Sequence, residues 1–297
     1  MKIACCFLYT ISKYGYPPKL SDVYRSLEEM KQMGFQHVEL EGVRGENLRE
    51  VYNNRTELKQ RCGDLGLNVM NFCPVLPDLV SVNEHERREG VDLFNFGLEL
   101  AVYFNCATVQ IDSFTPGLQF VGEAPYKEMI SFGKEFKVIV PDGFVWQKQW
   151  DALVDGIAKC NALAKSAGLP LCLEPRVGEI ISNTDAMLRL MDAVNDSNFG
   201  AVFDTGHQHA QKEILPLSVE KLGKRIFYLH VSDNNGLTNE HLALGKGTID
   251  WEGLFAVLKK HRFNGYAAID VGNVPEIETA YVESRIFLEN LASRLNL

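Results

Sequence analysis

The sequence predicts an α/β protein that folds as a single-domain (β/α)8 TIM barrel. Short apolar runs rich in β-branched and aromatic residues alternate eight times with longer amphipathic stretches, without a break. The apolar runs are hydrophobic on both faces, which is typical of a parallel sheet covered by helices. The chain has 297 residues, and eight such units fill about 250–300 residues in this barrel. A doubly wound open sheet is the competing arrangement, but the sequence contains neither a GxGxxG motif nor a P-loop.

Each strand is expected where a short apolar run is bounded by polar or turn-forming residues. The first run is KIACCFLY, the second HVELEGV, and the last GYAAIDVG. The eight predicted strands cover residues 2–9, 37–43, 68–75, 107–114, 170–176, 200–206, 226–233 and 265–272.

Each helix is expected in the amphipathic stretch that follows a strand. Gly34, Gly66 and Gly168 lie where helices would end, because glycine tolerates the left-handed conformation that often closes a helix. Asn183 or Thr184 is expected to cap another helix at its start. The eight predicted helices cover residues 19–34, 47–65, 83–104, 146–167, 184–194, 216–224, 250–261 and 276–293.

One connection is much longer than the others. Residues 115–145 are rich in proline and glycine and separate the fourth strand from its helix. A loop of about 30 residues inside a compact domain is usually functional. We therefore expect this insertion within the domain 1–297 to form a lid over the site or an interface between subunits.

Composition limits the function classes. The net charge of −9 argues against broad electrostatic binding of phosphate backbones. The seven cysteines show no metal-type spacing and suggest buried thiols in a reducing compartment. No apolar stretch approaches the roughly 20 residues that span a bilayer, and the start of the chain does not resemble a signal peptide. These features predict a cytoplasmic protein with no nucleic-acid or membrane partner.

Ligand-type residues end four successive predicted strands. Glu174, Asp204, His230 and Asp270 each follow an apolar run, in LCLE, AVFD, FYLH and AAID. Neighbouring strands lie about 5 Å apart, so these side chains can converge at the carboxyl-terminal face, where barrels of this kind carry their sites. Three carboxylates and an imidazole suit manganese, magnesium, cobalt or zinc, which the residues alone do not rank. The alternative is that each carboxylate separately caps the helix that follows it.

The same stretches resemble the sugar isomerase/epimerase superfamily, the xylose isomerase-like barrels that also include endonuclease IV. The likeness covers all eight units, and its specific motifs are LEPR at 173–176, FDTGH at 203–207, LHVSDN at 229–234 and LGKGTIDW at 244–251. By size, the tagatose/psicose 3-epimerase-like and inosose dehydratase-like branches fit best.

The resemblance implies roles for the strand-end residues. Glu174, Asp204, His230 and Asp270 match the family's metal ligands, and His207 matches a histidine that contacts substrate oxygens. Glu174 and Asp270 are implied as the catalytic acid and base of an isomerase or epimerase that works on a carbohydrate or polyol through an enediolate. The implied cofactor is one divalent ion, with manganese first and magnesium, cobalt or zinc as alternatives.

Two departures from the epimerase pattern keep other reactions open. Asp270 stands where epimerases usually carry the longer glutamate, and the arginine that often follows the histidine is absent, since 231–237 reads VSDNNGL. An inosose-type dehydratase or lyase, or an aldose–ketose isomerase, remains an alternative on the same metal site.

Two other classes of function compete with a sugar isomerase: a DNA endonuclease and a non-catalytic binding protein. An endonuclease IV-like phosphodiesterase needs a cluster of two or three metals, and the pattern wants an aspartate where this chain has Asn239 and histidines after strands three and four. Too few ligands remain for that cluster. A barrel that binds a sugar or a metal without chemistry is the non-enzymatic alternative.

Other residues are expected near a small carbohydrate substrate. His241, Glu41 and Trp146 are predicted to bind it, and Trp146, beside Phe144, would close over the sugar ring. His209 is interpreted as a surface histidine. For Glu41, an equally open interpretation is a polar group at the rim of the core. Since the late strand ends carry no arginine or lysine cluster, a non-phosphorylated substrate is expected, and a homodimer or homotetramer is the assembly to test.

Overall fold

A computed structural model describes residues 1–121 and 137–297 and confirms the predicted closed parallel barrel. Eight strands form the barrel in the order β1-β10-β9-β8-β7-β4-β3-β2, and β2 pairs again with β1. The strands are β1 (Lys2–Cys5), β2 (His37–Val43), β3 (Asn68–Val75), β4 (Thr108–Asp112), β7 (Leu171–Glu174), β8 (Phe199–Asp204), β9 (Ile226–Val231) and β10 (Tyr266–Ile269).

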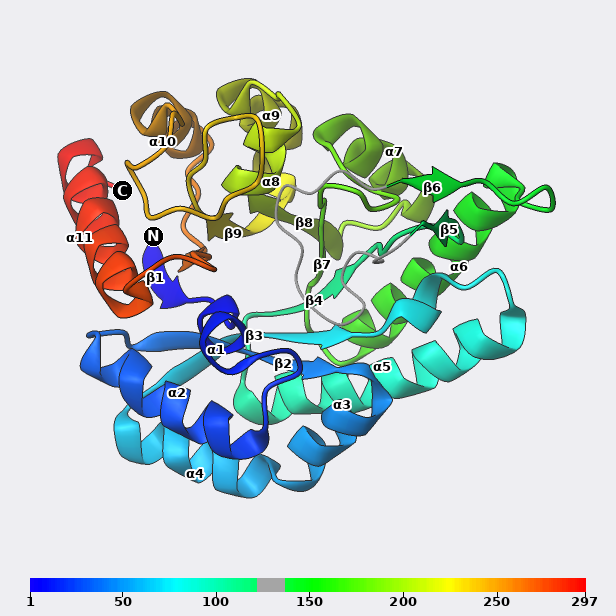
Figure 1. Ribbon diagram of the computed structural model, residues 1–297, viewed down its shortest axis with the longest axis horizontal. Helices are drawn as coiled ribbons and strands as arrows, with labels where there is room; N and C mark the ends of the chain where they lie inside the picture. The colour runs from blue at the N-terminus through cyan, green and yellow to red at the C-terminus, as the bar shows by residue number, and fades with distance from the viewer. Residues whose placement is uncertain (122–136) are drawn as a thin grey trace.

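Helices surround the barrel on its outside (Figure 1). They bury apolar faces against the strands, which explains why the strand sequences are apolar on both faces. The α-helices are α1 (Leu8–Tyr14), α2 (Leu20–Gln32), α3 (Arg44–Asn53), α4 (Arg55–Leu65), α5 (Glu84–Phe104), α6 (Trp146–Ser166), α7 (Thr184–Val194), α8 (Thr205–Ala210), α9 (Leu215–Leu222), α10 (Trp251–Lys260) and α11 (Ile277–Leu295).

The first apolar run is shorter as a strand than the sequence predicts. β1 ends at Cys5, and residues 8–14 form the helix α1 instead of continuing the strand. Leu8 and Ile11 are buried on one side of this helix. A continuous apolar run shows no period that would separate a strand from a buried helix, so the pattern alone left the boundary undetermined.

Two further helices differ from the prediction. The stretch 47–65 is interrupted at Asn54, which has φ −103° and ψ 12° and separates α3 from α4. The sixth predicted strand ends at Asp204, and the short helix α8 begins with the next residue. This early turn places the residues after Asp204 over the end of the barrel.

The long connection after β4 contains a small hairpin. β5 (Gln119–Phe120) pairs antiparallel with β6 (Val138–Ile139) before α6 begins. The expected lid or interface falls partly on residues 122–136, which lie outside the described residues.

Within the two described ranges, none of the helices combines the length and apolar character needed to cross a membrane.

Candidate metal centre and active-site cavity

The four strand-end residues converge at the carboxyl-terminal face of the barrel. One ligand atom from each of Glu174, Asp204, His230 and Asp270 lies within 4.8 Å of the others. Strand register explains this: Asp204 pairs with His230, and Asp270 directly follows β10, which pairs with β9. The structure therefore brings together the four side chains that were expected to converge at this face, and all four are buried.

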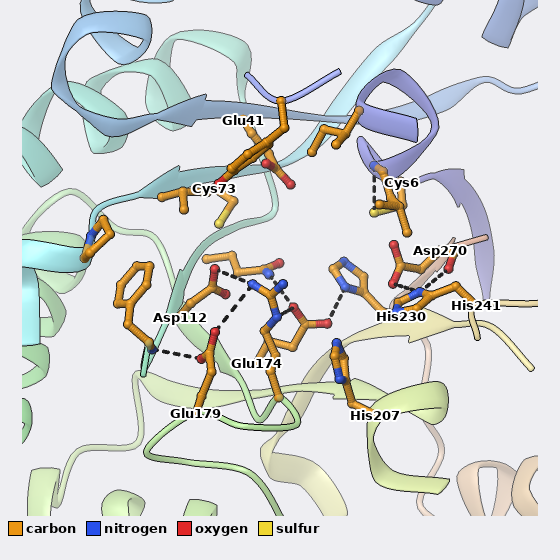
Figure 2. Close-up of a pocket in the computed structure, with 18 of the residues that line it drawn as sticks. Cys6, Glu41, Cys73, Asp112, Glu174, Glu179, His207, His230, His241 and Asp270 are labelled. Atoms are coloured by element: carbon orange, nitrogen blue, oxygen red, sulfur yellow. Dashed lines mark hydrogen bonds and ion pairs between the residues drawn. The ribbon is translucent and has the colours of Figure 1, made fainter. Parts of the chain in front are cut away.

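His230 lies at the centre of this group (Figure 2). Its Nδ1 is 2.7 Å from Oε1 of Glu174, and its Nε2 is 3.1 Å from Oε1 of Glu39. Burial lowers the pKa of His230, but the charges of Glu39 and Glu174 outweigh it and raise the pKa well above its usual value. Nδ1 thus faces the candidate ligand Glu174, while Glu39 contacts the opposite ring nitrogen, Nε2. An outer carboxylate commonly orients a ligating histidine in this way.

The two carboxylate oxygens of Asp204 have different surroundings. Its Oδ1 accepts a hydrogen bond from the backbone N–H of His207 at 2.5 Å and so caps α8. Its Oδ2 is buried and has no hydrogen-bond partner among the described residues. Burial raises the pKa of Asp204 well above normal, and the charges of Glu174 and Asp270 raise it further.

This donor set fits a divalent cation. An orphaned carboxylate oxygen buried beside two other carboxylates is costly unless a positive charge compensates it. Three carboxylates and one imidazole form a hard-to-borderline ligand set. A second candidate group consists of Cys6, Glu39 and His230. Burial and the neighbouring carboxylates raise the pKa of the Cys6 thiol well above normal, which disfavours the thiolate that a metal would need.

Asp270 is held by His241, which comes from the loop after β9. The Nδ1 of His241 is 3.1 Å from Oδ2 of Asp270 and 2.8 Å from its backbone oxygen. Burial alone would raise the pKa of Asp270, but the charge and hydrogen bond of His241 lower it below its usual range. Burial lowers the pKa of His241 in turn, and Asp270 more than offsets this and raises it. His241 and Asp270 both line the cavity, so the predicted substrate-binding histidine lies beside a candidate ligand.

His207 lies beside these residues on α8 and lines the same cavity (Figure 2). Its ring centroid is 5.4 Å from that of His241, in an edge-to-face arrangement. Burial lowers the pKa of His207 well below normal, and the nearby positive groups, His241 first, lower it further. His207 is therefore a neutral imidazole near neutral pH.

A carboxylate–arginine cluster forms the opposite wall of the cavity (Figure 2). Arg176 donates from Nη1 to Oδ2 of Asp112 at 2.8 Å, and the same atom is 3.7 Å from Oε1 of Glu179. Its Nε is 3.8 Å from Oε2 of Glu174. Burial and the charge of Asp112 raise the pKa of Glu179 to about 8, although Arg176 opposes this. The cluster holds a guanidinium beside Glu174.

Glu41 also reaches the cavity, as the sequence suggested. It lines the wall that β2 contributes, and burial together with the charges of Asp112 and Glu39 raises its pKa well above normal. A protonated Glu41 can donate a hydrogen bond to a hydroxyl oxygen as well as accept one. Glu39, its neighbour on β2, faces His230 instead.

Trp146 and His209 both lie outside the lining of the cavity. Trp146 begins α6, is 42% exposed, and is not among the described residues that line the cavity. His209 is half-buried and is not among the described residues that line the cavity. Its Nδ1 lies 2.8 Å from Oδ1 of Asn234 in the loop after β9.

Several site residues were not predicted. Arg176 is part of the LEPR stretch, but its contacts with Asp112 and Glu179 depend on the packing of β4 against β7. Asn71 donates from Nδ2 to Gln110 at 2.7 Å and to Glu39 at 3.1 Å. The only feature of the sequence that could have indicated Asn71 and Arg176 is that each is a polar residue within or directly after an apolar run.

The chain is similar in sequence to a family of barrel proteins and to several of their characterised members. Residues 27–291 match the family model described as xylose isomerase-like TIM barrel. An inosose dehydratase of Clostridium perfringens is 25% identical over 148 residues, which are 44% of this chain and 50% of that protein. A fructoselysine 3-epimerase of Shigella flexneri is 20% identical over 216 residues, 71% of this chain and 67% of that protein.

Solved structures agree on the fold. The crystal structure of the IOLI protein with a binding zinc atom superposes with a TM-score of 0.72 at 18% identity, over 99% of each chain. The chain spans about half the length of the inosose dehydratases that it matches. Because the family model covers nearly all eight strand–helix units and the barrel closes in the same order, the chain belongs to the xylose isomerase-like TIM barrel family.

Proposed function

We propose that this protein is a divalent-metal-dependent isomerase or epimerase that acts on a carbohydrate or polyol through an enediolate. The convergence of Glu174, Asp204, His230 and Asp270 within 4.8 Å of one another carries this proposal. The zinc atom of the IOLI structure and the names of the epimerase and dehydratase relatives support it. Manganese is our first candidate for the ion, with zinc, magnesium and cobalt as alternatives. Bound here, a divalent cation would polarise substrate oxygens as a Lewis acid.

The chain's own residues supply the proton transfers. Glu174 is the proposed base: its carboxylate takes a proton from a carbon next to a carbonyl, the electron pair of that C–H bond forms a C=C bond, and the π pair of the C=O bond moves onto the oxygen. Asp270 is the proposed partner across the substrate that returns a proton. His207 would donate a hydrogen bond to a substrate oxygen, and the Nε of Arg176 lies 3.8 Å from Oε2 of Glu174.

The cavity also suggests the charge of the substrate. Its lining includes five carboxylate side chains, those of Glu41, Asp112, Glu174, Glu179 and Asp270. The guanidinium of Arg176 is already engaged by Asp112 and faces Glu179. The late strand ends also carry no cluster of arginine and lysine that would bind a phosphate, so we propose a non-phosphorylated substrate. Glu41 would bind a hydroxyl group, while Trp146 would contribute only from outside the cavity wall.

A dehydratase is the second candidate, and Asp270 favours it. His241 lowers the pKa of Asp270, which makes it a poor proton donor, and aspartate is a methylene shorter than glutamate. Dehydration removes the proton from one carbon and the hydroxyl from the next, as water, and needs no return of a proton to the opposite face. The site does not favour DNA cleavage, because the endonuclease IV pattern wants an aspartate at position 239 to complete its metal cluster. Here the Nδ2 of Asn239 lies 2.9 Å from Nδ1 of His207 and 2.8 Å from Nε2 of His241 instead.

Metal analysis of the purified protein and a screen of ketoses and inososes in deuterated water test the proposal. An isomerase or epimerase incorporates deuterium at a substrate carbon and changes no composition, whereas a dehydratase yields a product that has lost one water. A sugar-binding barrel would bind without exchange. If no divalent ion binds and no candidate exchanges, the proposal is wrong.

We also propose a cellular location and an oligomeric state for this protein. The seven cysteines are free and buried, which supports a reducing and therefore cytoplasmic setting. A homodimer or homotetramer would be distinguished by light scattering of the purified protein.

A further inference from the structure

Two asparagines in the loop after β9 connect the histidines of the cavity to the backbone. Asn234 and Asn239 are both buried. Neither side chain was assigned a role by the sequence pattern. Their hydrogen bonds form one continuous chain, and its donors and acceptors can be assigned step by step from the backbone groups, whose roles are fixed.

The amide of Asn234 is oriented by two backbone groups. Its Oδ1 accepts from the N–H of Gly236 at 2.8 Å, and its Nδ2 donates to the carbonyl oxygen of Gly206 at 2.8 Å. A flipped amide would place an N–H against an N–H and an oxygen against an oxygen. Its orientation is therefore determined, and His209 must donate from Nδ1 to the same Oδ1.

Asn234 in turn orients Asn239. The Nδ2 of Asn234 lies 3.2 Å from Oδ1 of Asn239, so that oxygen accepts. The space is tight: a Cβ added at Gly206 would lie 2.7 Å from the same oxygen. The Nδ2 of Asn239 must therefore point the other way, toward the two histidines.

The two hydrogens of this amide nitrogen meet two ring nitrogens. Nδ2 of Asn239 lies 2.9 Å from Nδ1 of His207 and 2.8 Å from Nε2 of His241. Both ring nitrogens must then be acceptors that carry no hydrogen. The backbone N–H of Val177 also donates to Nδ1 of His207, at 3.2 Å, which requires the same assignment independently.

We propose that Asn239, oriented by Asn234, is a positioning residue that holds His207 and His241 in opposite tautomers. His207 carries its hydrogen on Nε2, and His241 carries its hydrogen on Nδ1, where it is donated to Asp270. One amide thus controls a hydrogen-bond donor of the cavity and the carboxylate of a candidate catalytic residue.

The tautomers have chemical consequences. With Nδ1 occupied as an acceptor, His207 can offer the cavity only an N–H donor, which selects a substrate oxygen that accepts, such as a carbonyl or a developing oxyanion. His241 binds Oδ2 of Asp270 through Nδ1–H. The alternative tautomer of His241 would leave Asp270 without this partner. An aspartate at position 239 would favour a hydrogen on a ring nitrogen that faces it, because a carboxylate only accepts.

Nitrogen NMR of histidine side chains tests the inference directly. The protein, labelled with 15N in its seven histidines, would be recorded after chelation and again loaded with zinc, which is diamagnetic. Signals of His207 and His241 are assigned from the variants His207→Gln and His241→Gln. We expect a hydrogen on Nε2 of His207 and on Nδ1 of His241 in both samples, because no step of the assignment involves a metal.

Variants at position 239 separate positioning from packing. In Asn239→Asp, the nitrogens that face residue 239 should gain hydrogens, Nδ1 of His207 or Nε2 of His241 or both. In Asn239→Leu, His207 should keep its tautomer because Val177 still donates to it, while His241 loses its restraint. The control is Asn95→Asp, an exposed asparagine on α5, which should leave both histidines unchanged.

Two results would overturn the inference: a native protein in which Nδ1 of a neutral His207 or Nε2 of a neutral His241 carries the hydrogen, or an Asn239→Asp protein with an unchanged hydrogen pattern on both rings. A purely structural asparagine would lower the melting temperature in both variants at position 239 without moving the ring hydrogens. The outcome is independent of turnover, so it stands or falls separately from the proposed reaction.

Discussion

The Nδ1 atom of His230 lies 2.7 Å from Oε1 of Glu174, although 56 residues separate them in the chain. Both residues also belong to the group that Asp204 and Asp270 complete. Two atoms that would both donate electron pairs to a cation approach this closely only when a proton or a metal lies between them. Glu174 is thus placed to bind an ion through Oε1 while its Oε2 faces Gln110 at 3.3 Å.

Replacing Glu174 by glutamine should abolish turnover while the fold survives. The variant keeps the shape of the side chain but loses both the proposed base and one anionic ligand, so we expect turnover to fall by at least about 10²–10⁴-fold. Circular dichroism checks the fold, and deuterium exchange with a converted sugar measures the chemistry. Glu252→Gln, an exposed glutamate on α10, is the control. Full activity in a folded Glu174→Gln protein would exclude the mechanism.

Divalent metal should stabilise the native protein. Ligand that binds only the folded state adds about 2.7 kcal/mol at a concentration 100-fold above Kd, and the barrel should melt at a higher temperature with manganese or zinc than after chelation. Asp204→Asn keeps the Oδ1 that caps α8 but removes the ligand charge, so the metal-dependent shift should shrink. An equal shift in both proteins would place the ion elsewhere.

Two glycines should respond to alanine with opposite signs. A Cβ at Gly156 in α6 would lie 2.1 Å from the backbone oxygen of Leu79, so Gly156→Ala should destabilise the protein by about 1–3 kcal/mol. A Cβ at Gly63 in α4 meets nothing within 4 Å, and Gly63→Ala should stabilise it by up to about 1 kcal/mol, the helix preference of alanine over glycine. Denaturant midpoints measure both. A neutral Gly156→Ala would contradict the close packing of α6 on residue 79.

Glu29 should make the stability of α1 and α2 depend on acid. It accepts hydrogen bonds from Tyr9 and Tyr14 at 2.7 Å each and from Lys13 at 2.8 Å. Burial alone would raise its pKa, but these donors lower it below its ordinary value of 4.5. Because the folded-state pKa is depressed, the stabilisation is complete above pH 4.5 and is lost as the pH falls through the folded value.

Glu29→Gln should therefore lower the free energy of unfolding by about 1 kcal/mol at pH 7, after allowance for solvent screening. The difference from the native protein should shrink toward pH 3. Glu28→Gln, its exposed neighbour on the same helix, should show neither effect. A deficit that stayed constant across this range would show that the charge of Glu29 is not what stabilises the two helices.

The strand-end residues were predictable because their signal is local. Each of Glu174, Asp204 and Asp270 closes an apolar run, and a closed barrel brings such run ends to one face regardless of loop details. The helix α1 was not predictable, because Leu8 and Ile11 continue an apolar run that fits either a strand or a buried helix.

Contacts across loops could not be read from the chain. Arg176 meets Asp112 only because β7 pairs with β4 in a register that sets Asp112 beside Glu174. The link from Asn239 to His207 needs both the early turn into α8 and the path of the loop after β9. No periodicity in either segment encodes that meeting.

The sequence by itself determined the eight-unit barrel and the residues that end its strands, because hydrophobic periodicity is a property of neighbouring residues. The tertiary structure alone decided which oxygen of Asp204 has no hydrogen-bond partner within residues 1–121 and 137–297, and which nitrogens of His207 and His241 face Asn239. Those features depend on distances of a few ångströms between side chains from different loops. Such distances follow from strand register and close packing, which a linear pattern does not specify.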